Sequence, residues 1–532
     1  MAVITGTLDA DRLVGTADDD IIFGYGVPSI LYRDVLIGGA GNDQYNLAEL
    51  IGSNPVHRYL IDDRGTDGGV DEIVGAGGLV QSASLGYRGF ATAVHQGNNL
   101  VIVTPGKPVR FHEPGSPPYE ITIRNHYDGA PVEWLTAGGV TYALPTGSAG
   151  TVGADIMAGT NGDDIFSADS GDDFVTGNSG HDILDSGAGN DHVFGGRGRD
   201  TVFAGEGDDW VFGEDGADTV DGGGGHDWLE LGLGADVAHG GEGNDHLFGM
   251  GGNDTLFGGD GSDTLTGGDG DDRLIGGRGG DTYRIGYDLE TLGTVPTSGH
   301  DVIVEKGDAA TWAEYDRIEF FGYYGPNSGS SAEAYARLSF SRSGNDMIIT
   351  SDGGLSSVRV QDQFRAGTER FHIEEIELNG GYWTPIRFRI LDGGRDDIGD
   401  DRSYPLGLGG ELNEVIFGTD GDDTVFSDSG SNFIWLGGGA DVLLYKESDP
   451  GLLYGQGGGS VNDIVMDFDP SQDRFDFTEI AGIDYSSLTI STSSDSDAII
   501  SWDSGSIEVS DIHIELRGVA AGLITPDLFD FA

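Results

Sequence analysis

Apolar residues recur at every ninth position between residues 159 and 284. In the fourteen consecutive units of this block the eighth position is always apolar or aromatic, from Phe166 and Val175 to Leu274 and Tyr283. Each unit also has Gly at position four and Asp at position six, as in GGEGNDHLF (240–248). A fixed short period with one inward apolar residue per unit predicts a solenoid in which two units form one coil. We expect short parallel strands at positions seven to nine and tight turns elsewhere.

The polar positions of the unit predict a metal site. Glycine at positions one, two and four permits left-handed backbone and close approach, so the six-residue turn can direct carbonyl oxygens inward. The aspartate adds an anionic oxygen, and Ca²⁺ prefers six to eight oxygen ligands of these kinds. We therefore expect several calcium ions between stacked turns, held by the position-six aspartates Asp164, Asp173, Asp182, Asp191, Asp200, Asp209, Asp218, Asp227, Asp236, Asp245, Asp254, Asp263, Asp272 and Asp281.

Shorter sets of related units lie nearer the two ends of the sequence. The first set contains GTADDDIIF (15–23) and GGAGNDQYN (38–46), and the third contains GTDGDDTVF (418–426), SDSGSNFIW (427–435) and LGGGADVLL (436–444). Asn432 replaces the aspartate in one unit, and Asp18 stands where glycine is expected in another. We expect these units to bind calcium more weakly or to serve only as coils, with Asp20, Asp43, Asp423 and Asp441 as candidate ligands.

Each repeat set is followed by a segment without the repeat. These segments contain short runs of β-branched and aromatic residues broken by Gly, Asn and Asp, which predict strands and hairpins. The predicted fold class is therefore all-β, with parallel β-roll blocks alternating with antiparallel β caps that protect the end strands. The expected segments are repeats at 1–46, a cap at 47–150, the main roll at 151–284, a cap at 285–405, the third repeat set at 406–445 and a C-terminal cap at 446–532.

The charge of the chain agrees with cation binding. The sequence has 91 Asp and Glu against 27 Lys and Arg, a formal net charge of −64. Such a chain repels itself when compact unless cations neutralise it, and nucleic acid is an unsuitable partner. Cysteine is absent, which excludes disulfides and thiol chemistry. No run reaches the roughly eighteen apolar residues of a membrane span, and residues 1–13 lack the basic and apolar regions of a Sec-type signal.

The nonapeptide array resembles the haemolysin-type calcium-binding repeats of the repeats-in-toxin (RTX) family, which Gram-negative bacteria export by type I secretion. Residues 463–477 resemble the segment that follows the repeats in such exported proteins, and DLFDFA (527–532) resembles their C-terminal export signal. The resemblance implies Ca²⁺ as the bound ion, the type I secretion machinery as a partner, and a secreted or cell-surface location. Millimolar extracellular calcium also suits weak, charge-dense sites.

The sequence contains no catalytic motif that we recognise. His112-Glu113 is not followed by a second His at helical spacing, and no G-x-S-x-G lies between a strand and a helix. We therefore favour a non-enzymatic structural or adhesive protein of a matrix, surface layer or biofilm. A secreted enzyme acting on polysaccharide or protein through an unrecognised site is one alternative, and an RTX toxin is another.

Outward residues eighteen positions apart are expected to stack on one face of the roll. On one face this row is aromatic and includes Phe174, Trp210, Phe212, Trp228 and Phe248. An aromatic row can stack sugar rings, seat a partner or a second copy of the chain, or pack against a neighbouring cap. We treat these five residues as a candidate surface-binding ladder, with cap packing as the alternative.

Overall fold

The computed structural model describes a subset of the chain. This subset comprises residues 2–5, 12–14, 21–24, 27–28, 34–37, 44–47, 57–61, 72–76, 92–96, 99–104, 119–123, 134–137, 140–145, 147–288, 293–294, 299–304, 316–321, 338–351, 356–363, 373–379, 386–392, 413–418, 421–427, 432–446, 461–480, 483–493, 496–503 and 511–531. The chain divides into two compact units, which are treated separately below: 1–307 with 355–358, and 308–354 with 359–532.

The structure is nearly all β. Within the described residues the helices are short 3-10 turns, namely η2 (Tyr485–Ser487), η3 (Ala521–Leu523) and η4 (Pro526–Leu528). None of the described helices has the length and apolarity needed to cross a membrane. The predicted all-β class is confirmed, with a parallel roll in the first unit and antiparallel strand pairs in both units.

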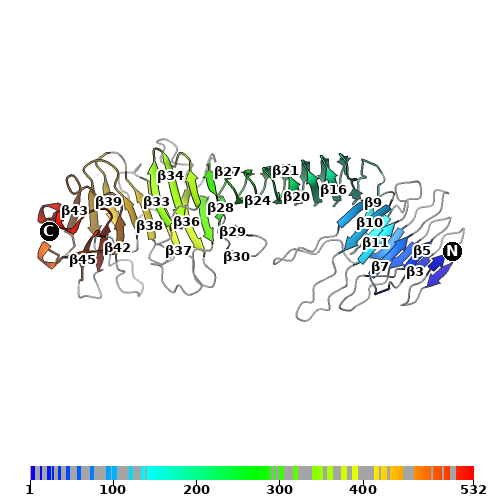
Figure 1. Cartoon of the computed structure of the whole chain (residues 1–532), viewed down its shortest axis with the longest axis horizontal. Helices are drawn as coiled ribbons and strands as arrows, with labels where there is room; N and C mark the ends of the chain where they lie inside the picture. Colours follow the sequence, from blue (N-terminus) through cyan, green and yellow to red (C-terminus); the bar gives the residue numbers. More distant parts are fainter. Residues whose placement is uncertain are drawn as a thin grey trace. The chain divides into compact units, whose positions relative to one another are not determined.

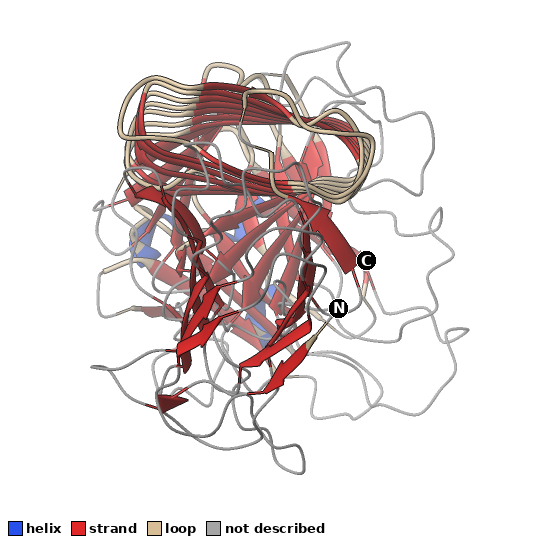
Figure 2. Ribbon diagram, turned by 90° about the vertical axis from the view of Figure 1, so that its right-hand side faces the viewer, coloured by secondary structure: helices blue, strands red, loops and turns tan. Residues whose placement is uncertain are grey.

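The roll occupies residues 150–285 together with a strand at 300–303, and it has two facing parallel sheets (Figures 1 and 2). One sheet, called here the even sheet, has the order β14 (Ile156–Ala158), β16 (Phe174–Gly180), β18 (His192–Gly198), β20 (Trp210–Gly216), β22 (Trp228–Glu230), β24 (His246–Gly251), β26 (Thr264–Asp269) and β28 (Thr282–Ile285). The facing odd sheet has the order β15 (Ile165–Ser167), β17 (Ile183–Ala188), β19 (Thr201–Glu206), β21 (Thr219–Gly224), β23 (Val237–Glu242), β25 (Thr255–Asp260), β27 (Arg273–Arg278) and β31 (His300–Ile303). Figure 2 shows the roll almost end on, with strands on two facing sides and turns at both edges.

Register within each sheet is fixed at eighteen residues, as two nine-residue units per coil require. Val175 pairs with Val193, and Leu184 with Val202, in parallel strands. The position-eight side chains point into the narrow space between the sheets and are fully buried from Val175 to Tyr283. Because each coil buries only two such side chains, apolar burial alone is a weak source of stability for the roll.

Glycine at position four is required by the stacking distance. A Cβ on Gly225, whose φ is +139°, would overlap the carbonyl oxygen of Gly207 in the preceding coil. The neighbouring Gly224 is different, since a Cβ there would approach only the flexible end of Glu206, at 3.3 Å. The turns therefore stack backbone on backbone, with room for side chains only at particular positions.

The N-terminal part of the first unit combines parallel coils with hairpins. One sheet has the order β1 (Val3–Thr5), β3 (Ile21–Gly24), β6 (Gln44–Leu47), β8 (Glu72–Ala76), β12 (Trp134–Ala137) and β13 (Val140–Ala143). The other has the order β2 (Arg12–Val14), β5 (Asp34–Ile37), β7 (His57–Ile61), β11 (Tyr119–Ile123), β10 (Asn99–Thr104) and β9 (Thr92–Gln96), with β4 (Val27–Pro28) beside β7. Pairing is parallel as far as β11 and β12 and antiparallel beyond them, so the segment predicted as an antiparallel cap contains continued coils as well.

The second unit repeats this plan around its own core. Its described strands include β32 (Asp316–Phe321), β36 (Ile373–Asn379), β37 (Ile386–Asp392), β38 (Asn413–Phe417), β40 (Phe433–Trp435), β42 (Val461–Val465), β44 (Thr489–Thr492), β45 (Ala498–Trp502) and β46 (Ile512–Leu516). A parallel sheet faces them, with β39 (Thr424–Ser427), β41 (Val442–Lys446), β43 (Arg474–Glu479) and β47 (Phe529–Phe531). A large apolar cluster, which includes Phe475, Phe477 and Trp502, fills this part of the unit.

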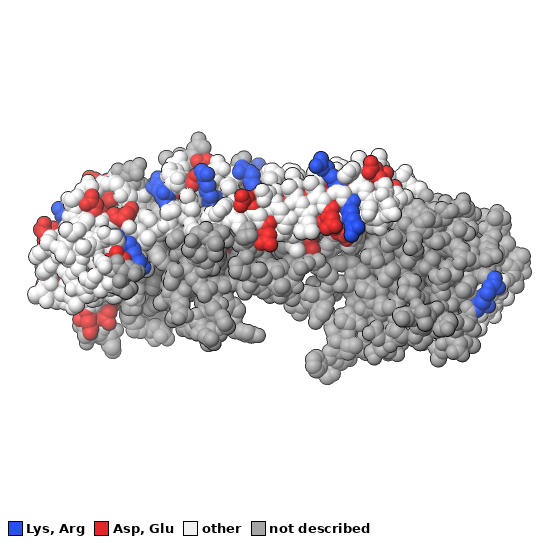
Figure 3. Space-filling model, in the orientation of Figure 1, with Lys and Arg blue, Asp and Glu red and all other residues white. Residues whose placement is uncertain are grey.

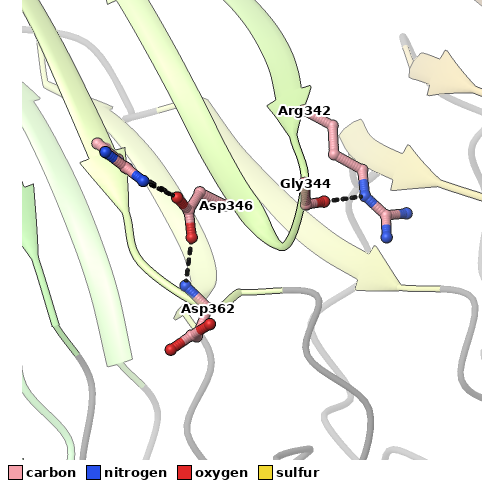
Figure 4. A network of polar contacts seen from close by, with 5 residues as sticks. Arg342, Gly344, Asp346 and Asp362 are labelled. Atoms are coloured by element: carbon pink, nitrogen blue, oxygen red, sulfur yellow. Dashed lines mark hydrogen bonds and ion pairs between the residues drawn. The ribbon is translucent and has the colours of Figure 1, made fainter.

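Three further strands and a small ribbon complete the described elements. β33 (Leu338–Ser343) and β34 (Asp346–Ser351) form a hairpin, β35 (Ser356–Val360) follows it, and β29 (Tyr287–Asp288) pairs with β30 (Gly293–Thr294). Polar contacts hold the hairpin (Figure 4). Asp346 accepts hydrogen bonds from the Arg359 guanidinium and the Asp362 amide, while Nε of Arg342 donates to the Gly344 carbonyl at 2.9 Å.

We expect Gly225→Ala to destabilise the roll and Gly224→Ala to leave it nearly unchanged. The first change forces a side chain into left-handed backbone, which costs roughly 1–2 kcal/mol, and adds the overlap with Gly207. Urea unfolding of the two variants in the presence of calcium compares them directly. Equal midpoints for the two alanine variants would contradict the stacking argument.

Candidate calcium sites

The position-six aspartates of the roll form a buried column at each turn edge, called here the carboxylate ladder. From Asp173 to Asp281 their side chains are at most 2 % exposed. In each, Oδ1 accepts the backbone N–H of the equivalent residue one coil earlier, as from Asp155 to Asp173 and from Asp191 to Asp209, both at 2.7 Å. The same bond, at 2.7–2.9 Å, recurs along both columns up to Asp281. One oxygen of every carboxylate is thus committed to holding coil on coil.

The second oxygen has no protein donor in most of the ladder. Oδ2 is buried without a hydrogen-bond partner in Asp173, Asp182, Asp191, Asp200, Asp209, Asp218, Asp227, Asp236, Asp245, Asp254, Asp263 and Asp272. Leaving a buried anionic oxygen unpaired is strongly unfavourable unless a cation or donor satisfies it. A repeating set of such oxygens therefore indicates a bound positive charge.

Backbone oxygens lie beside these unpaired carboxylate oxygens. The position-one glycine marks the place, because a Cβ on Gly177 would overlap Oδ2 of Asp182 and lie 2.6 Å from the carbonyl oxygen of Gly195. The same neighbours recur at Gly258, which faces Asp263 and the carbonyl of Gly276. Carboxylate and carbonyl oxygens around a space that only glycine leaves open fit a hard dication such as Ca²⁺.

Carboxylates and histidines alone do not make these sites. Across the described residues, no group of three or more His, Asp or Glu side chains is arranged to hold a metal ion. Each ladder aspartate leaves one carboxylate oxygen unpaired, and backbone carbonyl oxygens lie beside it. Calcium accepts such a ligand set, because it tolerates irregular geometry and neutral carbonyl ligands.

Burial raises the pKa of the ladder carboxyls well above their usual range, and repulsion from neighbouring aspartates adds to the effect. The pKa is about 8 at Asp173, Asp209, Asp254 and Asp263. It is about 7 at Asp191, Asp218 and Asp227, and about 6 at Asp182, Asp236 and Asp272. Without metal, the folded roll therefore favours protonated carboxyls, and a dication competes with those protons.

Comparison with known proteins identifies the repeat. The family model described as the RTX calcium-binding nonapeptide repeat matches residues 4–26, 32–48, 149–283 and 408–443. The chain is a haemolysin-type calcium-binding repeat protein. Its RTX repeats bind Ca²⁺, and the multiple matches agree with multiple ions.

The other comparisons add little. No protein in the curated set matches the chain. Among solved structures, the chain is similar to an extracellular lipase, LipA, from Serratia marcescens, with 16 % identity and a TM-score of 0.17. The alignment covers 53 % of this chain and 40 % of the lipase, so the chain spans less than half of that enzyme's length. A likeness at this level carries no argument about activity.

The RTX ladder extends further than the fourteen units recognised in the sequence. Asp155 is fully buried in an additional unit, 150–158, whose Gly150, Gly153 and Met157 keep the pattern. Asp301 continues the ladder after an insertion, because its Oδ1 accepts the N–H of Asp272 at 3.1 Å across twenty-nine residues. The first of these could have been found by extending the repeat one unit upstream, whereas the second is hidden by the changed spacing.

Four of the predicted calcium ligands lie outside the main roll, namely Asp20, Asp43, Asp423 and Asp441. Asp441 is buried and its Oδ1 accepts the N–H of Asp423 at 2.9 Å, so the third repeat set contains the same coil-to-coil bond. Burial raises the pKa of Asp441 to about 6. Asp20 and Asp43 lie outside the described residues.

Position five carries a second ladder, which the repeat pattern of the sequence does not indicate. Its side chains accept the backbone N–H of the position-five residue one coil later, as Asp208 does from His226 and His226 from Asn244, both at 2.8 Å. The direction is opposite to that of the carboxylate ladder. Acceptors at this position also include Asp163, Asp172, His181, Asn190, Asn244, Asn253 and Asp271.

The predicted aromatic ladder is assembled on the even sheet. Trp210 and Trp228 stack with ring centroids 5.2 Å apart and planes 15° apart, and both are half-buried. Phe174, Phe212 and Phe248 are 3 %, 8 % and 1 % exposed, so they are not available as a free surface. Strand β9 lies against β14 and β16, next to Phe174. Packing by neighbouring segments therefore accounts for part of the row, and a binding role for Trp210 and Trp228 stays a prediction.

We expect the metal-free RTX roll to be more stable at pH 5 than at pH 8.5. The ladder pKa values are raised in the folded state, so their contribution is complete below the ordinary aspartate pKa and is lost as the pH rises through about 6 to 8. Circular dichroism in a calcium chelator at the two pH values measures this. The opposite order, or no change, would show that the carboxyls are not buried together without metal.

Proposed function

We propose that Ca²⁺ is held by the carboxylate ladder, with Oδ2 of the position-six aspartates and the position-one carbonyls as ligands. The observation that carries this assignment is the row of buried Oδ2 atoms without a donor, from Asp173 to Asp272. Every ladder carboxylate keeps Oδ1 for the preceding coil, so each ion would be bound by oxygens that already fix the coil spacing. Ion binding and coil stacking then become one event.

We infer that calcium drives folding of the roll. Only two position-eight apolar side chains per coil lie between the sheets, and the formal charge of the chain is −64. Each dication offsets repulsion between aspartates that the fold forces together, and binding to the folded state alone stabilises it. Such a chain would stay expanded at submicromolar calcium and fold where calcium is millimolar.

The proposed setting is extracellular. Type I secretion as the export route follows from the family and from the C-terminal segment DLFDFA. Residues Pro526–Leu528 form η4, and β47 pairs with β43, so this segment lies within the fold of the second unit. Leu528 and Phe529 are 2 % and 6 % exposed, which fits a segment read by the export machinery before folding.

The proposed role is non-enzymatic, as a structural or adhesive component of a matrix, surface layer or biofilm. The described residues are coils, hairpins and their turns, and acidic and basic groups lie next to one another on the roll surface (Figure 3). Exposed pairs such as Arg197–Asp215 and Arg278–Asp260, at 3.5 and 3.4 Å, belong to the outer edges of the turns. Surface carboxylates offer sites at which calcium can bridge molecules. The six segments expected from the sequence, with the main roll at 151–284, are retained as the proposed domain plan.

We expect Asp227→Asn to weaken calcium-dependent folding and Asp208→Asn to leave it unchanged. Both remove one negative charge, and an asparagine at either position can still accept the coil-to-coil N–H. Only Asp227→Asn removes a proposed ligand. The calcium concentration at the midpoint of folding, followed by circular dichroism, should therefore rise for this variant, by about tenfold or more. Equal shifts for the two variants would remove Asp227 from the ligand set.

We expect calcium to produce ordered self-association in addition to folding. Small-angle scattering of the chain during a calcium titration separates the two, because compaction lowers the radius of gyration whereas assembly raises the mass. A compact monomer at all millimolar calcium concentrations would oppose the structural role and leave calcium-coupled folding intact. Cleavage of a polysaccharide or protein by the purified chain would favour the enzymatic alternative.

A further inference from the structure

The two ends of the described repeat stacks differ from the interior in one respect: the ladder oxygens there have protein donors. We propose that calcium occupies only the interior of the stacks, and that at these ends hydrogen-bond donors of the chain take the place of the ion. This inference rests on the calcium sites proposed above. It adds which coils of the stacks bind no calcium ion. The ends concerned are the N-terminal coil of the main roll and the C-terminal coils of the third repeat set.

At the N-terminal end the donors come from threonine at position two. Oδ2 of Asp164 accepts Thr160 N–H at 2.7 Å and its hydroxyl at 3.0 Å. Oδ2 of Asp155 accepts the same two groups of Thr151, at 2.6 and 3.2 Å. The predicted ligand Asp164 therefore already has the donors that the interior aspartates lack.

The choice of residue at position two explains this difference. Interior units have positive φ there, most often at glycine, for example Gly196 at +108° and Gly268 at +109°. In the remaining units Asp169, Asn178, Glu214 and Met250 adopt it, with φ between +70° and +77°. Thr151 and Thr160 do not adopt positive φ, and a β-branched side chain strongly disfavours it. Their turns consequently direct the position-two N–H at the aspartate, and the hydroxyl adds a second donor.

Side-chain donors also reach carbonyl oxygens in the N-terminal coil of the main roll and in the first unit of the third repeat set (418–426). Nδ2 of Asn178 donates to the carbonyl of Gly159 at 2.7 Å, and Nη1 of Arg342 donates to the carbonyl of Gly418 at 3.0 Å. Both acceptors are position-one glycines, the residues whose interior counterparts face the unpaired carboxylate oxygens. Arg342 thus brings a fixed positive charge to a carbonyl of the kind proposed to bind calcium.

The C-terminal coils contain the most complete replacement. Asp463 is fully buried, and its Oδ1 accepts Nδ2–H of Asn432 while its Oδ2 accepts the Tyr445 hydroxyl, each at 2.9 Å. Burial, together with the charge of Asp463, raises the pKa of Tyr445 well above its usual value, so the hydroxyl keeps its proton. Both oxygens of this carboxylate are satisfied without metal, and the repeat unit has Asn432 where the pattern has Asp.

The aspartate column at the opposite turn edge also ends in a carboxylate whose two oxygens both have protein donors. Oδ1 of Asp473 accepts the N–H of Asp441 at 3.1 Å and its Oδ2 accepts the N–H of Asp469 at 2.7 Å. These coils also contribute side chains such as Ile434, Leu436 and Leu443 to the apolar cluster of the second unit. Hydrogen bonds and apolar burial together give the C-terminal coils a source of stability that does not depend on calcium.

The test is hydrogen–deuterium exchange of the full chain, with mass spectrometry, in calcium and in chelator. In the wild-type chain we expect chelator to remove protection from β17 to β25 while β40 and β42 remain protected. Asn432→Asp replaces the amide donor with a second carboxylate, so protection of β40 and β42 in chelator should fall at least tenfold and return with calcium. Equilibrium dialysis should then count about one additional ion per chain.

Two further variants make the result interpretable. Asn190→Asp adds the same charge at exposed position five, where Asp163 and Asp172 already act as acceptors, and should change neither protection nor ion count. Tyr445→Phe removes only the hydroxyl donor to Asp463 and should make protection of β42 dependent on calcium. It preserves the ring in the core, so it tests the network even if Asn432→Asp fails to fold.

The outcomes separate this inference from the proposed function. Loss of protection in β40 and β42 together with β17 to β25 in the wild-type chain would overturn the inference, as would Asn432→Asp behaving like Asn190→Asp. Protection of β17 to β25 that is the same with and without calcium would instead overturn the calcium sites themselves.

Discussion

The central constraint of this molecule is a repeated buried carboxylate. One of its oxygens accepts a hydrogen bond from the preceding coil, and the other has no hydrogen-bond donor. Asp182 and Asp209 each lie in this position, and the eighteen-residue register repeats it along both turn edges of the roll. An unpaired buried anion is unfavourable, and a stack of them more so, because neighbouring charges repel. The fold therefore needs protons or cations at these levels before it can close. On the proposed assignment, calcium binding and the compact state are therefore linked in this chain.

The constraint shapes the rest of the turn. Position-one and position-four glycines leave the space in which carbonyl and carboxylate oxygens meet, as the predicted overlaps at Gly177 and Gly225 show. The position-five ladder runs in the opposite direction and holds the coils through neutral as well as charged acceptors, such as Asn244 and His226. On the proposed calcium assignment, the carboxylate ladder depends on cations and the position-five ladder does not. The aliphatic column between the sheets sets the spacing of both.

Much of this architecture could be predicted from the sequence, because the period is short and exact over many units. The inward position eight and the parallel strands follow from residues such as Val193, and the structure places them as expected. The hydrogen bonds between coils through position-six carboxylates such as Asp191 were not part of that expectation, and the role of these aspartates as calcium ligands stays a prediction. Asp155 lies in a unit that keeps the pattern and is therefore readable from the sequence, whereas Asp301 follows a changed spacing that only strand pairing reveals. The role of position five could not be read from composition, since Asp, Asn and His share only the ability to accept a hydrogen bond. Nor could the burial of Phe248, which depends on what covers the even sheet.

The two-unit coil has a consequence for how such a chain can change in length. Removing or duplicating eighteen residues keeps every strand on its own sheet and preserves both polar ladders, as the pairing of Trp210 with Trp228 illustrates. A nine-residue change keeps the turn motif but transfers all downstream strands to the opposite sheet, so that aromatic residues of the even sheet would stack on the threonines and isoleucines of the odd one. Length variation in this roll should therefore proceed in whole coils, even though the motif that a sequence reader sees is only half a coil long.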